Sequence, residues 1–353
     1  MKKILVIQNK RIGDVLIASL IAANIKQIIP NSRVDYFVYD YTTGVIENNP
    51  NIDRIIPINE KELKKIPTLI KTAWRIRKEK YDIIFDPYSK FQSKFISLIS
   101  QAPVRVGYHK KGKRSIFNFH THKILPLVKK TLPCGKSIEE RVYLVNSVFP
   151  LKTPIYTPKL YLTDTEKKYS KLNSYSKPVV MVGVLGSTPQ KSMPYSYVVA
   201  LIDYVTSNFE VNIMFNYAPN QKGEATKIYE ACKDQDAIIF DVYESNIRGF
   251  ISLMNQCKLL ISNEGGSVHI AKALDKPTFT IFSPYILKSD WSSFEDGQMH
   301  TSVHLLDEKP DLFSTSRKDR RKIEQDPSFL YNQLTPEMIL KKLTPFLKYH
   351  LNE

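Results

Sequence analysis

The chain has 353 residues, 42% of them hydrophobic and 24% charged, with a formal net charge of +16 at pH 7, which predicts a soluble globular protein of two domains. Its N-terminal apolar run is too short for a signal peptide, and no other stretch approaches the length of a membrane span, so we expect a cytoplasmic protein. The three cysteines are widely spaced and odd in number, which indicates neither a disulfide framework nor a zinc site.

The first half of the chain alternates between short apolar runs and segments with helical spacing. This alternation is typical of βαβ units and predicts a parallel sheet. The first helix is expected from Asp14 to Ile29, where it stops before Pro30. The apolar runs predict strands at residues 3–7, 34–39, 54–58, 82–85 and 104–106.

Positive charge is concentrated in this half. Residues 1–160 hold 29 Lys+Arg against 12 Asp+Glu, whereas residues 161–353 hold 22 against 23. The high positive charge of this half suggests an acidic partner, namely an anionic membrane surface, a phosphorylated acceptor or a nucleic acid. Its densest basic run lies in residues 108–136, which we expect to be irregular, and it predicts either a solvated loop or a binding segment. This run contains Lys110, Lys111, Lys113 and Arg114.

Three prolines between Pro150 and Pro158 predict an extended linker, after which the alternation restarts. We therefore expect one Rossmann-like domain in residues 1–155 and a second in residues 156–330. Residues 331–353 should form a C-terminal helix that packs back on the body or contacts a membrane surface. Two α/β domains of this kind predict parallel sheets that face a central cleft, with ligands beyond the carboxyl ends of the strands.

Residues 258–284 read as strand, turn, helix and strand. The turn holds Asn263, Glu264, Gly265 and Gly266, and adjacent glycines allow close approach of a ligand to the backbone. The free N–H groups at a helix N-terminus bind anions, while a carboxylate accepts hydrogen bonds from sugar hydroxyls. This turn therefore suits a diphosphate joined to a sugar, although an ordinary turn capped by Ser267 fits the same pattern.

Two further loops carry candidate functional residues. Asp14 follows the first strand, where it is either the N-cap of a helix or a general base. The loop from Gly186 to Pro194 offers a glycine, hydroxyls and Lys191 before a helix, which suits a phosphate group. Asp234-Gln235-Asp236 has the form of a metal site, but it precedes its strand and is interpreted as a turn.

Five segments in order resemble the bacterial heptosyltransferase family, glycosyltransferase family 9, which has the GT-B fold. The opening strand and its Gly-Asp-x-Leu turn are found at residues 4–16. The family's Gly-x-Ser-x-x-x-Lys-x-Trp-Pro segment is similar to Gly186–Pro194, with Met193 in place of the aromatic residue and Thr188 where many members have Arg. The remaining matches are Tyr81–Asp86, Arg105–Tyr108 and Asn263–Ala271, in which Glu264 replaces the usual Asp.

This resemblance implies an α/β protein of GT-B architecture that catalyses inverting, metal-independent sugar transfer without a cofactor. The implied donor is a nucleotide-diphospho-sugar, ADP-heptose, and the implied acceptor is the core of a lipopolysaccharide or lipooligosaccharide. Asp14 is then the base, and Lys191 neutralises the donor diphosphate. The implied donor-binding residues are Ser187, Thr188, Glu224, Glu264, Gly265, Gly266 and His269.

The basic first half suits an acidic glycolipid acceptor and predicts peripheral contact with the cytoplasmic face of the inner membrane. Besides the basic run, Lys10 and Arg11 are the expected acceptor-binding residues. We expect no nucleic-acid partner, because the basic residues form no recognisable motif with stacking aromatics. Two alternatives stay open, a nucleotide-sugar epimerase of the same architecture and a catalytically silent binding protein.

Overall fold

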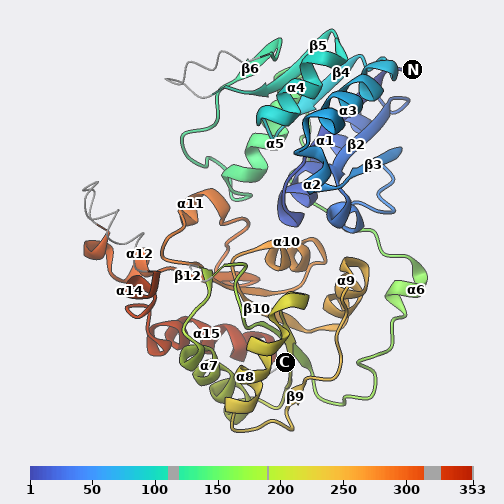
Figure 1. Ribbon diagram of the computed structural model, residues 1–353. Coiled ribbons are helices and arrows are strands. Elements are labelled where there is room, and N and C mark those ends of the chain that lie inside the picture. Colours follow the sequence, from blue (N-terminus) through green and yellow to red (C-terminus); the bar gives the residue numbers. More distant parts are fainter. Residues whose placement is uncertain (110–118, 189–190, 314–326, 352–353) are drawn as a thin grey trace. The chain divides into compact units, whose positions relative to one another are not determined.

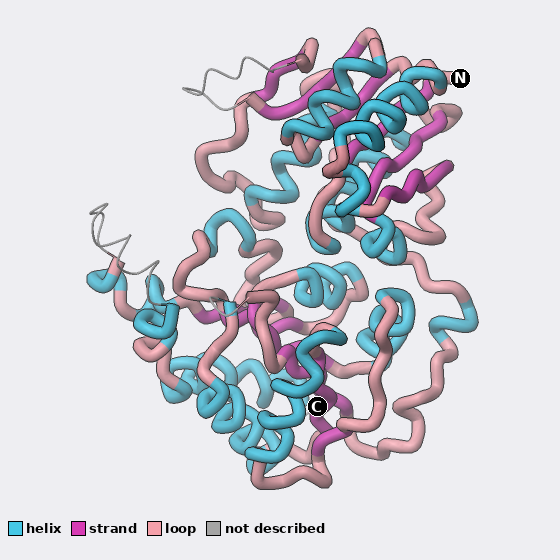
Figure 2. Tube along the Cα trace, in the orientation of Figure 1, coloured by secondary structure: helices cyan, strands magenta, loops and turns pink. Residues whose placement is uncertain are grey.

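A computed structural model describes residues 1–109, 119–188, 191–313 and 327–351 (Figures 1 and 2). The chain forms two compact units. Unit 1 comprises Met1–Tyr161 together with Ser289–Ser293, and unit 2 comprises Leu162–Lys288 and the chain from Phe294 onward. The expected boundary after residue 155 lies six residues before this division.

Unit 1 is built on a six-stranded sheet in the order β3-β2-β1-β4-β5-β6, in which every pair is parallel. Chain order reverses between β1 and β4, as in doubly wound nucleotide-binding folds. The central strands are buried on both faces because their residues are almost entirely apolar. The strands are β1 (Lys3–Ile7), β2 (Arg33–Tyr39), β3 (Arg54–Ile58), β4 (Ile83–Asp86), β5 (Val104–Tyr108) and β6 (His122–Ile124).

The helices of unit 1 form two pairs. α1 (Ile12–Ile28) packs beside α5 (Lys136–Asn146), and α3 (Ile66–Lys78) packs beside α4 (Phe91–Ser100). Apolar residues dominate α1 all round, so most of this helix is buried. The shorter helices are η1 (Asp40–Val45) and α2 (Glu60–Leu63).

Unit 2 repeats the topology of unit 1. Its parallel sheet has the order β12-β11-β10-β7-β8-β9, so the reversal lies between its first strand, β7, and β10. The strands are β7 (Val179–Gly183), β8 (Asn212–Asn216), β9 (Ile238–Ile239), β10 (Leu259–Asn263), β11 (Thr278–Ile281) and β12 (His300–Val303).

The longer helices of unit 2 also separate into two groups, visible around the sheet in Figure 1. One group packs around α7 and the other joins α9 to α10. The longer helices are α7 (Tyr195–Asn208), α8 (Lys222–Ala231), α9 (Ile247–Gln256), α10 (Gly266–Ala273) and α15 (Pro336–Leu351), and the shorter ones are α6 (Asp164–Lys167), η3 (Pro219–Gln221), α12 (Leu305–Glu308), η4 (Pro310–Leu312) and α14 (Pro327–Tyr331). The short helix α11 (Lys288–Trp291) belongs to unit 1 from Ser289 onward.

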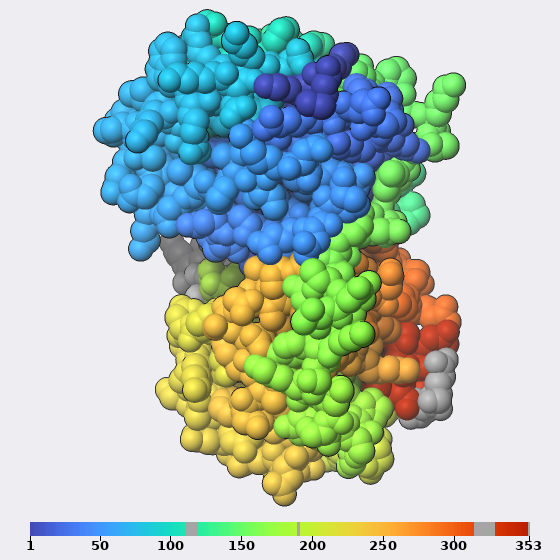
Figure 3. Space-filling model, turned by 90° about the vertical axis from the view of Figure 1, so that its right-hand side faces the viewer, coloured from blue at the N-terminus to red at the C-terminus, as the bar shows by residue number. Residues whose placement is uncertain are grey.

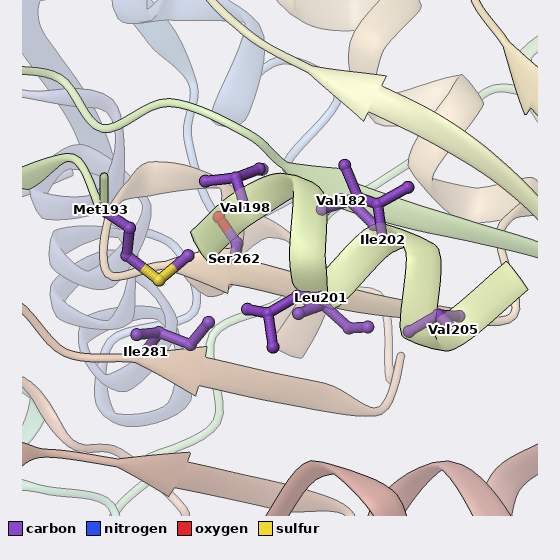
Figure 4. A pocket seen from close by; sticks show the side chains of 10 residues that line it. Val182, Met193, Val198, Leu201, Ile202, Val205, Ser262 and Ile281 are labelled. Carbon is purple, nitrogen blue, oxygen red and sulfur yellow. The ribbon is translucent and has the colours of Figure 1, made fainter. Parts of the chain in front are cut away.

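The core of unit 2 lies between α7 and the strands beneath it. Figure 4 shows Val198, Leu201 and Ile202 of α7 around a void of about 10 Å³, with Met193 at one end. A space of this size holds at most about one water molecule, so the packing is close. Met193 is 4% exposed and therefore belongs to the core, although it lies in a loop.

The C-terminal segment completes this core. α15 packs against α7, β11 and β12, and Leu330, Tyr331 and Leu334 join the same apolar cluster. At the N-terminal end of unit 2, the chain from residue 162 lies on the surface of the unit, as the green segment in Figure 3 shows. Ion pairs from Glu166 to Arg248 and from Lys171 to Glu244 hold it there.

The structure corrects several predicted elements. The first helix begins at Ile12, two residues before its predicted start, so Gly13 lies inside the helix. Residues 60–78 form two helices and not one continuous helix, because Asn59 caps α2 and Pro67 stands in the first turn of α3. Residues 108–136, expected to be irregular, contain β6.

Among the described residues, no helix is both long enough and apolar enough to cross a membrane.

Candidate functional site

The point of chain reversal in unit 1 lies between the carboxyl ends of β1 and β4. Loops that follow such neighbouring strands lead in opposite directions and leave a crevice for ligands. The chain after β1 enters α1 and brings Asp14 to the first turn of that helix. β4 ends at Asp86 at the same edge of the sheet.

Asp14 is held by two cations. Its Oδ1 lies 2.7 Å from Lys10 Nζ and 3.3 Å from Arg141 Nη2, and its side chain is 6% exposed. Arg141 comes from α5 and is nearly as buried, at 7%. The N-cap of α1 is Arg11, and Asp14 makes no cap hydrogen bond. The N-cap interpretation of Asp14 is therefore wrong, because the helix begins before this residue.

Two side-chain carboxamides in the chain between β1 and Asp14 are buried without hydrogen-bond partners among the described residues. Gln8 is 0% exposed and Asn9 is 1% exposed, and neither side chain has a hydrogen-bond partner among the described residues. Buried polar atoms normally have partners in the protein, in ordered water or in a bound ion. Unit 1 thus presents a carboxylate, a lysine and two carboxamides in the chain after β1, and α5 adds Arg141.

A buried His–Asp pair lies at the same edge of the sheet, where β4 ends. His120 Nε2 lies 3.0 Å from Asp86 Oδ2, and both side chains are 0% exposed. Gly107 of β5 makes room for the imidazole, because a Cβ at residue 107 would lie 2.2 Å from His120 Cε1. The Asp86 backbone and side chain also bind Ser89, which fixes the turn after β4.

In unit 2 the reversal between β7 and β10 carries the loop from Gly186 to Pro194. Gly186 donates its N–H to Ser192 Oγ at 2.9 Å and accepts from Gln221 Nε2 at 2.8 Å. A Cβ at Gly186 would lie 2.2 Å from the carbonyl oxygen of Lys191, so this turn requires glycine. Ser187 and Thr188 are exposed on it.

Lys191 and Glu264 form an ion pair between the loops that follow β7 and β10. Lys191 Nζ lies 3.2 Å from Glu264 Oε1, with side chains 35% and 8% exposed. Glu264 Oε2 accepts from the backbone N–H of Ser283 at 2.9 Å. Burial raises the pKa of Glu264, and the Ser283 N–H and the Lys191 ammonium oppose that rise. Lys191 and Glu264, for which separate roles were expected, therefore contact each other in the structure.

The glycines after Glu264 lie at the start of α10. Gly265 is its N-cap and has an extended backbone, and a Cβ there would meet nothing within 4 Å. The helix therefore begins without a side-chain cap, which excludes capping by Ser267. His269 lies one turn into the helix and is half-buried. Asn263, at the end of β10, is 3% exposed, and its amide has no hydrogen-bond partner among the described residues.

A pocket of about 790 Å³ opens beside this loop, within the range of ligand sites. Ser187, Thr188 and Glu224, all expected to bind the donor, line it together. Its remaining lining residues are Leu185, Gly186, Ser192, Met193, Pro194, Tyr195, Asn220, Gln221, Tyr331 and Asn332.

The expected acceptor-binding residues separate into two groups. Lys10 contacts Asp14 and lies 5.3 Å from the centroid of the Trp291 ring, whereas Arg11 is exposed. The basic run Lys110, Lys111, Lys113 and Arg114 lies outside the described residues. Over the described chain, no group of three or more His, Cys, Asp or Glu side chains is arranged to hold a metal ion.

Four residues of these sites were not predicted from the sequence: Arg141, His120, Tyr331 and Asn332. Arg141 lies 127 residues after its partner Asp14, and His120 lies 34 residues after Asp86. Tyr331 and Asn332 follow a stretch in which the apolar periodicity is weak. No local pattern marks any of them, because each reaches its site through the tertiary fold.

Comparisons with known proteins point to one family and one fold. A family model described as glycosyltransferase family 9 (heptosyltransferase) matches residues 69–318. The chain is 22% identical to lipopolysaccharide heptosyltransferase 1 of Campylobacter coli, covering 79% of this chain and 83% of that protein. Its fold is similar to a glycosyltransferase family 9 protein from Veillonella parvula, with a TM-score of 0.76, 16% identity and coverage of 98% and 97%. The E. coli ADP-heptose heptosyltransferase II gives a TM-score of 0.72, 17% identity and 98% coverage of both chains.

Proposed function

Because the chain belongs to glycosyltransferase family 9 and is a glycosyltransferase, we propose that it transfers heptose from ADP-heptose to the core of a lipopolysaccharide or lipooligosaccharide. The names of relatives support this choice of substrates, since three of them describe heptosyltransferases acting on these glycolipids and that of the E. coli structure includes ADP-heptose. The pocket of unit 2 is the main observation in support of a donor-binding site, because a glycine turn, two hydroxyls and a carboxylate line it together.

In this proposal the donor diphosphate lies against Ser187 and Thr188, and the Glu224 carboxylate accepts from a ribose hydroxyl. Lys191 leaves its pair with Glu264 and neutralises the phosphates. Glu264 then accepts from hydroxyls of the sugar. Gly265, Gly266 and His269 line the same donor site, where the uncapped start of α10 offers free N–H groups.

The reaction we propose is a single displacement with inversion. The acceptor hydroxyl forms a bond to the anomeric carbon while the bond from that carbon to the phosphate oxygen breaks. Asp14 takes the hydroxyl proton, and the nucleoside diphosphate leaves with the bonding electrons. Lys191 and the helix N-termini stabilise the negative charge that develops on the leaving group, so the proposal needs no metal ion.

The acceptor in this proposal is an acidic glycolipid that meets unit 1. Lys10 and Arg11 attract its negative charge, and the basic run at residues 110–114 adds to that attraction. Peripheral contact with the cytoplasmic face of the inner membrane follows as part of the same proposal, because the acceptor is anchored in lipid. Such electrostatic contact weakens as salt concentration rises.

One series of experiments tests the proposal. Thermal melting of the full chain with ADP-heptose, UDP-glucose, ADP and UDP should show the largest upward shift with ADP-heptose, because ligands of the native state stabilise it. Incubation of ADP-heptose with and without a heptose-deficient lipopolysaccharide core should give transfer in the first case and at most slow hydrolysis in the second. An isomerised donor in the absence of acceptor would instead establish an epimerase.

A further inference from the structure

One helix of unit 1 exposes an apolar stripe. α3 packs into the core of the unit through residues such as Leu69 and Ile76. Ile66, Ile70 and Trp74 follow one another at intervals of four residues, so they lie together on another side of the helix. They are 71%, 42% and 50% exposed, respectively. Single exposed apolar residues are common on protein surfaces, whereas three large ones in a row indicate an interaction surface.

A row of positive charge lies beside the apolar stripe. Lys71, Arg75 and Lys78 are exposed and stand four and three residues apart, so they form a second line along the helix. None of the three forms an ion pair with any residue that the structure describes, and α3 contains no acidic residue. The Arg77 guanidinium lies 4.9 Å from the centroid of the Trp74 ring. The side of α3 that faces water is therefore both apolar and basic.

This combination fits the surface of an anionic bilayer. Helices that lie in a membrane interface combine lysine and arginine with tryptophan and large aliphatic residues. Tryptophan prefers the level of the headgroups, and acidic headgroups attract the neighbouring cations. Interfaces between proteins are instead depleted in lysine, which makes a protein partner the less suitable occupant of this face.

The direction of α3 brings one end of the stripe toward the edge of the sheet where Asp14 lies. α3 leads from β3 to β4, two parallel strands of one sheet, so it runs from the carboxyl edge back to the amino edge (Figure 1). Its first residue, Ile66, therefore lies toward the carboxyl edge. α4 leads from β4 to β5 in the same way and packs beside α3, and its first residue, Phe91, is 59% exposed. A membrane in contact with this face would thus lie close to the expected acceptor site.

We propose that α3 docks on the anionic surface of a membrane and holds unit 1 close to acceptors anchored in lipid. Ile66, Ile70 and Trp74 enter the headgroup region, and Lys71 and Arg75 contact acidic headgroups. The inference rests on the proposed function, because an acceptor anchored in lipid gives the docking its purpose. It assigns to one helix a contact that the proposed function derives from the overall charge of unit 1.

Vesicle binding by the full chain tests this assignment. Vesicles of phosphatidylethanolamine and phosphatidylglycerol should bind the protein, and vesicles of phosphatidylcholine alone should bind it much more weakly. Since the chain has two tryptophans, Trp291→Phe leaves Trp74 as the only indole reporter. Its fluorescence emission should shift to shorter wavelength when anionic vesicles are added, because the ring leaves water.

Two double variants separate the apolar from the basic contribution. Ile70→Ala with Trp74→Ala should weaken binding to anionic vesicles at least about tenfold, because less apolar area leaves water. Lys71→Gln with Arg75→Gln should weaken it about thirtyfold, or about fivefold for each charge removed. Both variants should melt near the temperature of the wild type, because the substitutions are at exposed positions.

Unit 2 offers matched controls for both variants. Leu306→Ala on α12 shortens an apolar side chain that is 40% exposed, close to the value for Ile70. Lys227→Gln with Lys233→Gln removes the same charge from two exposed lysines. Both controls should bind anionic vesicles as the wild type does.

The outcomes are distinguishable. Absence of binding, or equal binding to the two kinds of vesicle, overturns the inference. A loss confined to the charge variant, with no shift in Trp74 emission, shows attraction without insertion of the stripe and also overturns it. Dimers that the Ile70 and Trp74 variant fails to form, without vesicle binding by the wild type, would assign the face to a second copy of the chain and overturn it as well.

Transfer of heptose to a deacylated, water-soluble core acceptor tests the proposed function separately. If the wild type transfers heptose to this acceptor but does not bind vesicles, the inference fails and the proposed function stands. If it binds vesicles as expected but transfers nothing, the proposed function fails and the membrane contact stands.

Discussion

Replacement of Asp14 by Asn separates a catalytic carboxylate from a structural one. Asn keeps the shape of the side chain and an oxygen that accepts hydrogen bonds, but it loses the charge and cannot take a proton at neutral pH. If Asp14 is the base, turnover should fall by about a hundredfold or more. Donor affinity should stay near that of the wild type, because the proposed donor residues all belong to unit 2.

The structure also predicts a loss of stability. Removing one partner of a buried ion pair costs about 3–5 kcal/mol. Asn retains a hydrogen bond to Arg141, and Glu140 Oε2 remains 3.6 Å from the same guanidinium. Lys10 is 37% exposed, so solvent screens its share of the interaction. We therefore expect the free energy of unfolding to fall by about 2 kcal/mol.

Arg141→Met supplies the matched comparison, because it breaks the same pair from the other side and leaves the carboxylate in place. Both variants should lose similar stability in urea denaturation, whereas transfer by Arg141→Met should fall by no more than about tenfold. The assay is heptose transfer at saturating donor, at a temperature where both variants are folded. Equal turnover in the two variants would refute the assignment of Asp14 as the base.

Three further predictions concern other parts of the chain. Lys191→Ala should weaken ADP-heptose binding about tenfold in calorimetry, with Lys342→Ala as a surface control, because a cation facing a diphosphate is lost; unchanged affinity would contradict its role. Transfer should continue in excess EDTA. If chelation abolishes the activity and added magnesium restores it, the metal-free mechanism is wrong. Burial lowers the pKa of His300 to about 4, so between pH 6.5 and 4 the unfolded chain binds a proton that the native state does not. Stability should therefore fall by roughly 2–3 kcal/mol on acidification from pH 7 to pH 4.5, and His300→Gln should flatten that fall in denaturation curves.

Much of the fold could be predicted because the strands at the sheet centres are mostly apolar. β1, β4, β7 and β10 occupy sheet centres, and burial on both faces leaves continuous hydrophobic runs in the sequence. The edge strands β6 and β12 were missed for the opposite reason. Each is short and contains polar residues such as His122 and Thr301, so neither shows the apolar run of a central strand.

The candidate site was predictable to the extent that it follows strand ends. The loops after β7 and β10 could be recognised because their glycines, hydroxyls and charges are adjacent in sequence. The pairing of Lys191 with Glu264 could not, since it depends on the order in which the strands of unit 2 associate. The start of α1 was misplaced because Asp is a common N-cap, whereas Arg11, with no side-chain cap bond, begins this helix.

The contact between Gly107 and His120 has an evolutionary consequence. Since the imidazole of residue 120 occupies the space of any side chain at residue 107, the two positions are not free to drift independently. An alanine at 107 becomes acceptable after residue 120 has first become smaller, and that earlier step removes the imidazole partner of Asp86. The order of substitutions along a lineage is thereby constrained, and a histidine kept at one position carries with it a glycine thirteen residues earlier.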